Sequence, residues 1–418
     1  MATRRINVDL PLVGTAAVLS AYGLAMVYSA GHTYVRTSAA TAWRAQAVWW
    51  LAGIIGAWAV SRASVRLIEW ITVPLYALTI VLLLALKVPG LGSGAGAASS
   101  MSGWLTIGGH RLGQPSEFAK LTVVLMLART LGQYRVAPKS LLELWKPLLV
   151  VGVPFLLILM QPDLGTAIVF VGIFFAMLFW TGVPWQLLLL LASPVISLIL
   201  GFDPRVWGAW FLGLCALVLW YKPYLGEGLF VIVANVFMGV VGPIVWEHTK
   251  PYQQNRLKVF IDPTADPRGS GYHVIQSQVA IGSGGWFGRG YLKGPQKLLA
   301  YLPEQNTDFI FSVVGEELGF IGVTIALVLF LTLFMRVIRV AERANDSFGS
   351  LVAFGLLASW FTHVLENVGM TLNLMPITGI PLPFFSYGGS FMLASWVAIG
   401  MLARISSEGR GKTGQFRV

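Results

Sequence analysis

The sequence predicts an all-α polytopic membrane protein. Of its 418 residues, 56% are hydrophobic and only 11% are charged, whereas a soluble domain has about 25% charged residues. The mean hydropathy is +0.72. Long apolar runs recur along the chain, near the length of about 20 residues that a helix needs to cross the hydrocarbon core. These three observations favour a helical membrane bundle over a soluble domain.

About twelve transmembrane helices are expected from these runs, and several of them are short. Three candidates between 184 and 247 are separated by "GFDPR" and "YKPYLGEG". No repeat of fixed period and no linker is visible, so we expect one membrane domain over residues 1–418. The predicted spans are 8–30, 46–61, 65–86, 116–133, 145–161, 164–182, 184–201, 206–221, 227–247, 309–335, 348–372 and 385–404.

The first run is interpreted as an uncleaved span rather than a signal peptide. Arg4 and Arg5 precede it, but no small-residue cleavage site follows it. The single cysteine, Cys215, lies in the apolar run "FLGLCALVL". This excludes a disulfide framework and a thiolate metal site, and it favours a small apolar side chain packed in a helix.

The Lys and Arg residues predict the orientation, since cytoplasmic loops carry more of them than outside loops. With the N-terminus in the cytoplasm, sixteen fall inside and five fall in the short outside loops. The net charge of +11 is thus explained by topology, and the basic residues form no stripe for nucleic acid. Both termini are predicted to be cytoplasmic. Two extracytoplasmic loops, 87–115 and the large 248–308 loop, hold most of the polar residues.

Glu117 and Lys120, in "GQPSEFAKL", are three residues apart on a helix that begins after Pro115. That spacing places them on one helix face, where they can pair. Charges inside a membrane helix are costly unless they face protein or a water-filled cavity. The alternative is that Ser116 and Glu117 only cap the helix N-terminus. The lysine favours a cavity.

Other ionisable residues inside spans have structural explanations. Asp163, directly after Pro162, begins a span, where a carboxylate is favourable on dipole grounds alone. For Glu316 and Glu317 a structural ion pair is the default. His363 and Glu366 lack the further ligands of a zinc site, so none is predicted.

The segment "IDPTADPRGSGYH", 261–273, contains two Asp-Pro pairs, Asp262-Pro263 and Asp266-Pro267. Turn formation explains an Asp-Pro pair in a loop, because proline keeps its predecessor out of the α region. Two features favour function. The glycines of "GSGYH" and "AIGSGGWFGRG" would let backbone N–H groups bind an anion. Cations crowd the same loop, and a carboxylate among them suits general-base work on a phosphorylated substrate: Lys250, Arg256, Lys258, Arg268, Arg289, Lys293 and Lys297.

At these residues the chain resembles the SEDS family (shape, elongation, division and sporulation) of integral membrane glycosyltransferases. The matching strings lie over roughly residues 100–400, with a gap at 185–247. The phrase "GYHVIQSQVAIGSGG" is more similar to the elongation type, RodA, than to the division type, FtsW. The strings are "QPSEFAKL", "QPDLGTAI", "PYQQNRLKVFIDPTADPRGSGYHVIQSQVAIGSGGWFGRG", "LPEQNTDFIFSVVGEELGF" and "PITGIPLPFFSYGGS".

The resemblance implies a peptidoglycan polymerase that joins lipid II disaccharides into glycan strands and releases undecaprenyl pyrophosphate. It assigns the catalytic role to Asp266, in the D-P-x-G-x-G-Y string, and not to Asp262. It implies an inverting transfer, with Arg256, Lys258 and Arg268 at the pyrophosphate, with or without a divalent cation (Mg²⁺ or Mn²⁺). The further residues expected to bind substrate are Glu117, Lys120, Asp163, Trp104 and Ser386.

Two departures from the family pattern stand out. Family members usually have a basic residue before the loop tryptophan, but here Gly103 precedes Trp104. That function is either missing or supplied by Arg111. The family usually has ten spans, and here 184–247 adds two more candidates. An even number of extra spans keeps the 248–308 loop outside.

The resemblance also implies partners and a location. These are lipid II, a class B penicillin-binding protein that acts as transpeptidase, other elongation-complex proteins and the bacterial cytoplasmic (inner) membrane. Two other classes remain open, a lipid II flippase and a non-catalytic cell-wall scaffold. Intramembrane charges and broken helices also occur in transporters.

Overall fold

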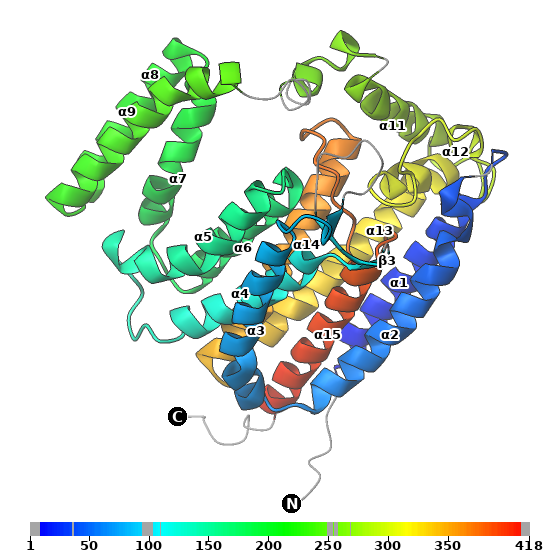
Figure 1. The fold of residues 1–418 in the computed structure, drawn as a ribbon, viewed down its shortest axis with the longest axis horizontal. Helices are drawn as coiled ribbons and strands as arrows, with labels where there is room; N and C mark the ends of the chain where they lie inside the picture. The colour runs from blue at the N-terminus through cyan, green and yellow to red at the C-terminus, as the bar shows by residue number, and fades with distance from the viewer. Residues whose placement is uncertain are drawn as a thin grey trace, which may run out of the picture.

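A computed structural model describes residues 9–35, 37–93, 103–108, 110–248, 254, 258–267 and 269–410. Within them, twelve helices follow the twelve predicted spans, so the predicted all-α membrane fold is confirmed (Figure 1). They are α1 (Leu10–Gly31), α2 (Ala42–Arg62), α3 (Val65–Ala85), α4 (Pro115–Leu131), α5 (Trp145–Leu159), α6 (Leu164–Trp180), α7 (Trp185–Leu200), α8 (Pro204–Tyr221), α9 (Leu225–His248), α13 (Ile310–Glu342), α14 (Ser347–Thr371) and α15 (Gly389–Arg410).

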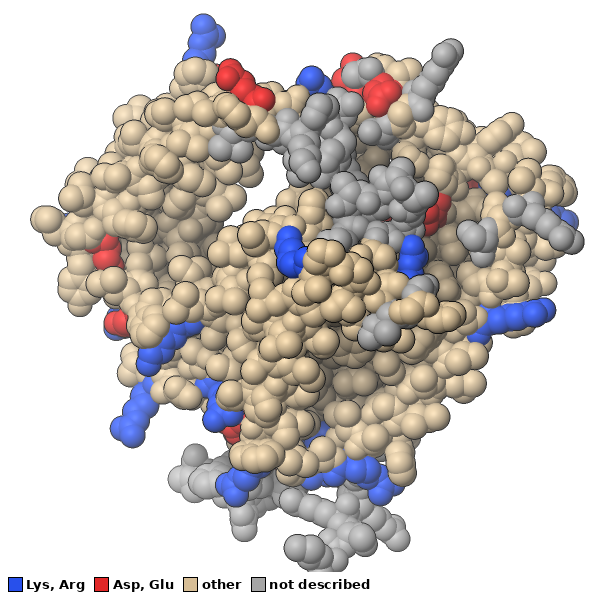
Figure 2. Space-filling view, in the orientation of Figure 1, with Lys and Arg blue, Asp and Glu red and all other residues tan. Residues whose placement is uncertain are grey.

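Eight of these helices are long and apolar enough to cross a membrane, and α6 and α7 are shorter apolar helices. The centre of the bundle is formed by α14 and α15, because 72% and 78% of their most apolar windows are buried, against 6% for α8. Lys and Arg gather at the end of the molecule that bears both termini, and few charges interrupt the apolar middle (Figure 2).

Local sequence explains where the helices begin. Asp9 accepts a hydrogen bond from the Leu12 N–H at 3.2 Å and caps α1. Ser64 caps α3 in the same way, and Asp346 caps α14. These side chains satisfy N–H groups that have no partner within the first turn. Pro115 occupies the first position of α4, where a missing N–H costs nothing.

Small residues let central helices pack closely. A Cβ on Gly400 of α15 would lie 2.4 Å from the Ala57 carbonyl oxygen of α2, and one on Gly53 would lie 2.9 Å from the Trp396 Cβ. The α2–α15 contact therefore depends on these two glycines, as is common where membrane helices approach each other.

The loop predicted at 87–115 contains a small antiparallel sheet, which the sequence analysis did not predict. Its order is β1 (Gly92–Ser93), β2 (Trp104–Ile107) and β3 (His110–Gly113). After β3, the Gln114 N–H donates to the Ser390 hydroxyl at 3.1 Å. This bond ties the sheet to the first turn of α15.

The large 248–308 segment is also more ordered than a loop. It contains a short 3-10 helix, η3 (Pro263–Ala265), followed by α11 (Ser270–Gly284) and the single turn α12 (Pro295–Leu298). Both α11 and α12 lie at the end of the molecule opposite the two termini (Figure 1). A second single 3-10 turn, η1 (Ser38–Thr41), precedes α2, and another, η2 (Leu142–Leu144), precedes α5.

The extra helices form a unit of their own, α7–α9, with a small core of Leu190, Leu214 and Val231. A buried amide holds the three helices together. The Asn235 amide donates to the Ser193 hydroxyl at 2.8 Å and accepts from the Ser197 hydroxyl at 2.6 Å. The Trp210 indole donates to Ser197 at 3.1 Å. At the end opposite the two termini, the unit is separated from the main bundle (Figures 1 and 2).

Helix α13 is broken at Gly319, where the backbone has φ 64° and ψ −161°. The segment 285–290 fills the break with backbone hydrogen bonds. The N–H groups of Arg289 and Gly290 donate to the carbonyls of Glu316 and Glu317, both at 2.9 Å. The N–H groups of Phe320 and Ile321 donate in turn to the carbonyls of Gly285 and Trp286 at 2.9 and 3.2 Å. The groups freed by the break thus regain partners, as membrane depth requires.

Candidate functional site

Asp266 lies at the end of η3 and is half-buried. Its Oδ1 accepts a hydrogen bond from the Gly269 N–H at 3.0 Å, and its main-chain oxygen accepts from the Gly271 N–H at 3.0 Å. A Cβ on Gly269 would fall 2.2 Å from the Asp266 Oδ2, and one on Gly271 would fall 2.2 Å from the Pro263 carbonyl oxygen. The two glycines therefore hold the Asp266 carboxylate in a fixed turn.

Asp262 has a different environment, since it is exposed and caps η3. Its Oδ1 accepts hydrogen bonds from the Thr264 hydroxyl at 2.6 Å and from the Thr264 N–H at 2.9 Å. These bonds stabilise the ionised form and lower the pKa of Asp262 below its usual 3.8. The turn interpretation of this Asp-Pro pair is confirmed.

Among the cations predicted near Asp266, the exposed ones within the described residues are Lys258, Arg289 and Lys293. Arg256 and Arg268 lie outside the described residues, so their positions remain predictions. Lys297 is not available to a phosphate, because it is 1% exposed and forms an ion pair with Glu317 at 2.8 Å. Its inclusion among the substrate cations was wrong.

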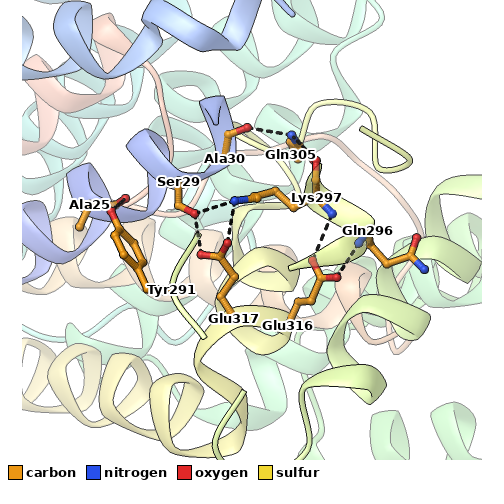
Figure 3. A network of polar contacts seen from close by, with 9 residues as sticks. All are labelled: Ala25, Ser29, Ala30, Tyr291, Gln296, Lys297, Gln305, Glu316 and Glu317. Atoms are coloured by element: carbon orange, nitrogen blue, oxygen red, sulfur yellow. Dashed lines mark hydrogen bonds and ion pairs between the residues drawn. The ribbon is translucent and has the colours of Figure 1, made fainter. Parts of the chain in front are cut away.

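Lys297 is the centre of a buried polar network that joins α12 to α1 and α13 (Figure 3). The Lys297 ammonium donates to the Ser29 hydroxyl at 3.1 Å, and that hydroxyl donates to Glu317 at 2.6 Å. Glu316 accepts from the Gln296 and Lys297 N–H groups at 2.7 and 3.2 Å. The structural ion pair expected for these two glutamates is confirmed for Glu317, whereas Glu316 is held by backbone N–H groups. Together these contacts anchor the 285–308 segment to the bundle.

The glycines of "AIGSGGWFGRG" do not form an anion-binding nest. The Arg289 and Gly290 N–H groups are used by α13, as described above. A Cβ on Gly284 would fall 1.9 Å from the Gly315 carbonyl oxygen, and one on Gly288 would fall 2.1 Å from the Glu317 carbonyl oxygen. These glycines instead let the segment pack closely on the broken helix α13, where a side chain would clash.

Glu117 and Lys120 pair as predicted, with 2.9 Å between the Lys120 Nζ and the Glu117 Oε2 and with exposures of 4% and 3%. The cap residue of α4 is Gln114, without a side-chain hydrogen bond, and Glu117 lies in the first turn, where the helix dipole favours its charge. The sequence analysis missed the second partner of Lys120, the His363 Nε2 at 2.7 Å. The face of the Phe391 ring lies 4.7 Å from the same ammonium.

His363 is held in turn by the segment that follows α14. Its Nδ1 lies 2.9 Å from the Pro381 carbonyl oxygen, which can only accept a hydrogen bond, so Nδ1 carries the hydrogen and Nε2 accepts from Lys120. The Phe391 ring stacks on the imidazole at 4.6 Å. Lys120 therefore contacts a carboxylate, an imidazole and an aromatic ring inside the bundle.

Asp163 is buried and caps α6, accepting from the Thr166 N–H at 3.0 Å. Asp163 therefore has the structural role expected for it at the start of a helix. Its carboxylate also lies close enough to Glu117 and Glu366 to act on both electrostatically. The Cβ position of Gly165, on the first turn of α6, lies 2.4 Å from Ile380. Asp163 thus sits where α6, α4, α14 and the 372–388 segment meet.

Trp104 and Ser386 occupy different environments. The Arg111 guanidinium lies over the Trp104 ring, 5.8 Å from its centre, so the predicted substitute for the missing basic residue does lie beside the tryptophan. Ser386 is 2% exposed, and its hydroxyl donates to the Thr307 carbonyl at 2.6 Å and accepts from the Leu382 N–H at 2.8 Å. These bonds fold the 372–388 segment against the start of α13.

Gln46 is a further residue that the sequence analysis missed. Its amide donates to the Ser386 carbonyl at 2.9 Å and accepts from the Gly388 N–H at 3.1 Å. It is 1% exposed on α2. A single glutamine in an apolar run gives little signal, although a buried amide at membrane depth needs such partners.

The chain is similar to known proteins over nearly its whole length. The sequence profile of the FtsW/RodA/SpoVE family, described as cell cycle protein, matches residues 10–211 and 208–411. Peptidoglycan glycosyltransferase RodA of Treponema pallidum is 34% identical over 429 residues, covering 96% of this chain and 98% of that protein. The probable peptidoglycan glycosyltransferase FtsW of Geobacter sp. (strain M18) is 34% identical over 410 residues, with 96% and 98% covered. Peptidoglycan glycosyltransferase MrdB of Escherichia coli (strain K12) is 36% identical over 337 residues, with 80% and 77% covered.

Solved structures are similar over nearly the whole chain. One, which concerns the structural coordination of polymerization and crosslinking by a peptidoglycan synthase complex, has a TM-score of 0.72 and 28% identity, covering 98% of this chain and 100% of that one. The crystal structure of the rod shape determining protein RodA of Thermus thermophilus has a TM-score of 0.61 and 25% identity, with 96% and 97% covered.

Proposed function

The chain belongs to the FtsW/RodA/SpoVE family and is a multi-pass membrane peptidoglycan glycosyltransferase, and we propose how its residues carry out the transfer. The substrate is lipid II, whose disaccharide units are joined into a glycan strand while undecaprenyl pyrophosphate leaves. Identity to the RodA of Treponema pallidum and to the FtsW of Geobacter sp. is the same, 34%, and does not separate the two roles. The elongation role is therefore proposed from the RodA-like string "GYHVIQSQVAIGSGG".

Asp266 acts as the general base. Its carboxylate takes the proton of the acceptor sugar hydroxyl as that oxygen forms a bond to the anomeric carbon of the donor. The bond between that carbon and the pyrophosphate oxygen breaks, and the electron pair leaves with the pyrophosphate. An α-linked donor gives a β-linked product, so the transfer is inverting and needs no covalent glycosyl-enzyme.

The observation that supports Asp266 best is its fixed turn. The Gly269 N–H donates to the Asp266 carboxylate, and the Gly271 N–H donates to the Asp266 main-chain oxygen, both at 3.0 Å. A catalytic base has to be positioned before the substrate arrives. In Asp262, by comparison, the Oδ1 accepts two hydrogen bonds from Thr264, one from its N–H group and one from its hydroxyl.

The leaving pyrophosphate needs positive charge beside it. Lys258 is exposed in the same segment as Asp266, and Arg256 and Arg268 are assigned to the same task from the sequence. Within the described residues, no group of three or more His, Cys, Asp and Glu could hold a metal ion. The pyrophosphate is assigned to these cationic side chains, with or without a divalent cation (Mg²⁺ or Mn²⁺).

The remaining substrate-binding assignments are proposals of different kinds. Trp104, with Arg111 on its ring, would contact a sugar or pyrophosphate from the β2–β3 hairpin. Glu117, Lys120 and Asp163 are buried, so they would act indirectly, by holding α4, α6 and α14 in place. Ser386 would act in the same indirect way, through the 372–388 segment.

The test is polymerisation by the purified protein. Wild type and Asp266→Ala are incubated with labelled lipid II, with and without a class B penicillin-binding protein, and glycan chains are resolved on a gel. Polymer from wild type and none from Asp266→Ala supports the proposal. Lipid II flipping in liposomes without polymer, from the protein alone or from its complex, would establish the flippase alternative instead.

The class B penicillin-binding protein is the proposed partner, because a polymerase of this kind supplies strands that a transpeptidase cross-links. The location proposed is the bacterial cytoplasmic membrane, with both termini inside and the 87–115 and 248–308 segments outside. The scaffold alternative makes a different prediction, namely that cells carrying Asp266→Ala grow and keep their shape.

A further inference from the structure

A small cavity lies at the end of the molecule that bears the two termini, far in sequence from Asp266. It has a volume of about 50 Å³ and is lined by Asp9, Arg336, Arg339, Val340, Arg343 and Ser406. Three elements meet there: the start of α1, the last turns of α13 and the last turns of α15. Three of its six lining residues are arginines.

The spacing of the arginines gathers their charge. Arg336 and Arg339 lie on α13, and Arg343 is its C-cap residue; spacings of three and four residues place the three on one helix face. Arg336 is half-buried and the other two are exposed. A cation at a helix C-terminus is favourable by itself, but that effect needs only one charge in the last turn, and it does not require three guanidinium groups around one cavity.

The carboxylates of Glu408, Asp346 and Asp9 are already in use. Among the described residues, none of the three arginines forms an ion pair. Glu408 pairs with Arg404 at 2.8 Å, and Asp346 caps α14 through the Gly349 N–H at 2.7 Å. Asp9, in the cavity wall, caps α1 and also accepts from the Ser406 hydroxyl at 3.5 Å. The cavity therefore has an excess of positive charge.

We infer that this cavity binds a phosphate group, supplied by the headgroup of an anionic glycerophospholipid of the cytoplasmic leaflet. Guanidinium groups bind phosphate through paired, charge-assisted hydrogen bonds. The proposed orientation puts this end of α13 at the headgroup level of that leaflet, where basic pockets between helices bind anionic lipids. Figure 2 shows Lys and Arg gathered at the same end. The inference depends on this orientation and not on the glycosyltransferase activity.

The experiment uses the full chain in nanodiscs of phosphatidylcholine, with or without phosphatidylglycerol, and measures the thermal unfolding midpoint and the lipid retained in native mass spectrometry. In wild type, phosphatidylglycerol should raise the midpoint and remain bound. In the triple variant Arg336→Gln, Arg339→Gln, Arg343→Gln, retention should weaken at least about a hundredfold, since each guanidinium lost from the cavity removes a charge-assisted hydrogen bond to the phosphate that is worth about a factor of ten.

A matched control removes three exposed basic residues at other sites predicted to be cytoplasmic, Arg135→Gln, Lys139→Gln and Lys146→Gln. This variant should keep the wild-type response. Equal retention by wild type and the arginine triple variant, or equal losses in the two triple variants, would overturn the inference. If the arginine triple variant does not fold, Arg336→Gln alone should reduce retention about tenfold through the lost hydrogen bond, and an unchanged value would overturn the site.

A third arm distinguishes the source of the phosphate. Inorganic phosphate is added to the protein in detergent without lipid. If it raises the midpoint of wild type as much as phosphatidylglycerol does, the cavity recognises a free anion and the lipid assignment is wrong. A response to phosphatidylglycerol alone supports the lipid. Polymerisation assays on the same samples report separately on the glycosyltransferase proposal.

Discussion

The Lys120 ammonium lies 2.7 Å from the Nε2 of His363, although the two residues are 243 positions apart in the chain. The bond joins α4 to α14, and through the Nδ1 of His363 it reaches Pro381 in the segment after α14. Three partners therefore surround one buried cation: the Glu117 carboxylate, the His363 imidazole and the Phe391 ring. Such complete satisfaction is what a charge at membrane depth requires.

We predict that Lys120→Met destabilises the protein by about 3–5 kcal/mol, because it leaves the Glu117 carboxylate buried without its cation. The double variant Glu117→Gln, Lys120→Met should recover part of this loss. Thermal unfolding in detergent measures both. His363→Gln, which keeps an acceptor for Lys120, should cost less than His363→Phe, which does not. Equal losses for Gln and Phe would mean that the hydrogen bond is unimportant.

For Asp266, we predict that Asp266→Asn and Asp266→Ala both reduce polymerisation at least a hundredfold, about the contribution of a general base. Asp262→Asn is the matched control, since it changes the other Asp-Pro pair of the same segment. It should retain activity near wild type. The measurement is the yield of glycan from labelled lipid II at equal amounts of folded protein. Near-normal yield from Asp266→Asn would remove Asp266 from the role of base.

The anchor formed by Lys297 gives a third prediction. Lys297→Met removes the partner of a fully buried Glu317 and should cost about 3–5 kcal/mol. Lys297→Met combined with Glu317→Gln should cost less, because no unpaired charge remains. Limited proteolysis within 285–308 reports whether the outer segment has detached from α1 and α13. Arg289→Met, an exposed cation of the same segment, should leave the digestion pattern unchanged.

Gly319→Ala tests the break in α13. A Cβ there would lie 2.3 Å from the Gly288 nitrogen, and the residue has a positive φ of 64°. We expect a loss of at least about 1–3 kcal/mol from backbone strain, seen as a lower unfolding midpoint. Gly282→Ala, in α11, meets nothing within 4 Å and should be neutral or stabilising by about 0.5–1 kcal/mol. A neutral Gly319→Ala would contradict the backbone pairing of 285–290 with α13.

The turn at Asp262 should depend on pH. Hydrogen bonds from Thr264 lower the pKa of Asp262, so its ionised form is favoured in the folded protein. The contribution to stability is present above the unfolded pKa and is lost as pH falls through the lower, folded pKa. NMR titration of the labelled carboxyl carbon measures this pKa. Thr264→Ala should raise it toward 3.8, and an unchanged value would refute the hydrogen-bond assignment.

The sequence predicted the helices well, because apolar length is a local property and each of the twelve spans shows it. It predicted the Glu117–Lys120 pair for the same reason, since three residues on one helix fix the geometry. The strands of 87–115 were missed because they are only two to four residues long, too short for an alternating pattern to stand out.

Two errors have a common physical origin. Lys297 reads as a free cation in a polar segment, but Glu317 and Ser29 neutralise it after folding. The glycines of 284–290 read as an anion-binding loop, but carbonyls of α13 accept the Arg289 and Gly290 N–H groups and the Gly284 carbonyl accepts the Gly288 N–H group. In both cases the competing partner is distant in sequence or lies in a helix break, and neither is visible in a local pattern. His363 was missed as a Lys120 partner for the same reason.

The polar contacts of α7–α9 and those of Lys120 differ in when they can form during synthesis. Asn235 reaches Ser193 and Ser197 across only 42 and 38 residues, so that unit can complete its hydrogen bonds as soon as α9 has left the ribosome. Lys120 has Glu117 at once, but His363 is made 243 residues later. The nascent chain must therefore hold a partly satisfied ammonium in the bilayer until α14 arrives, and a chain that stalls before α14 is the species that membrane quality control should recognise.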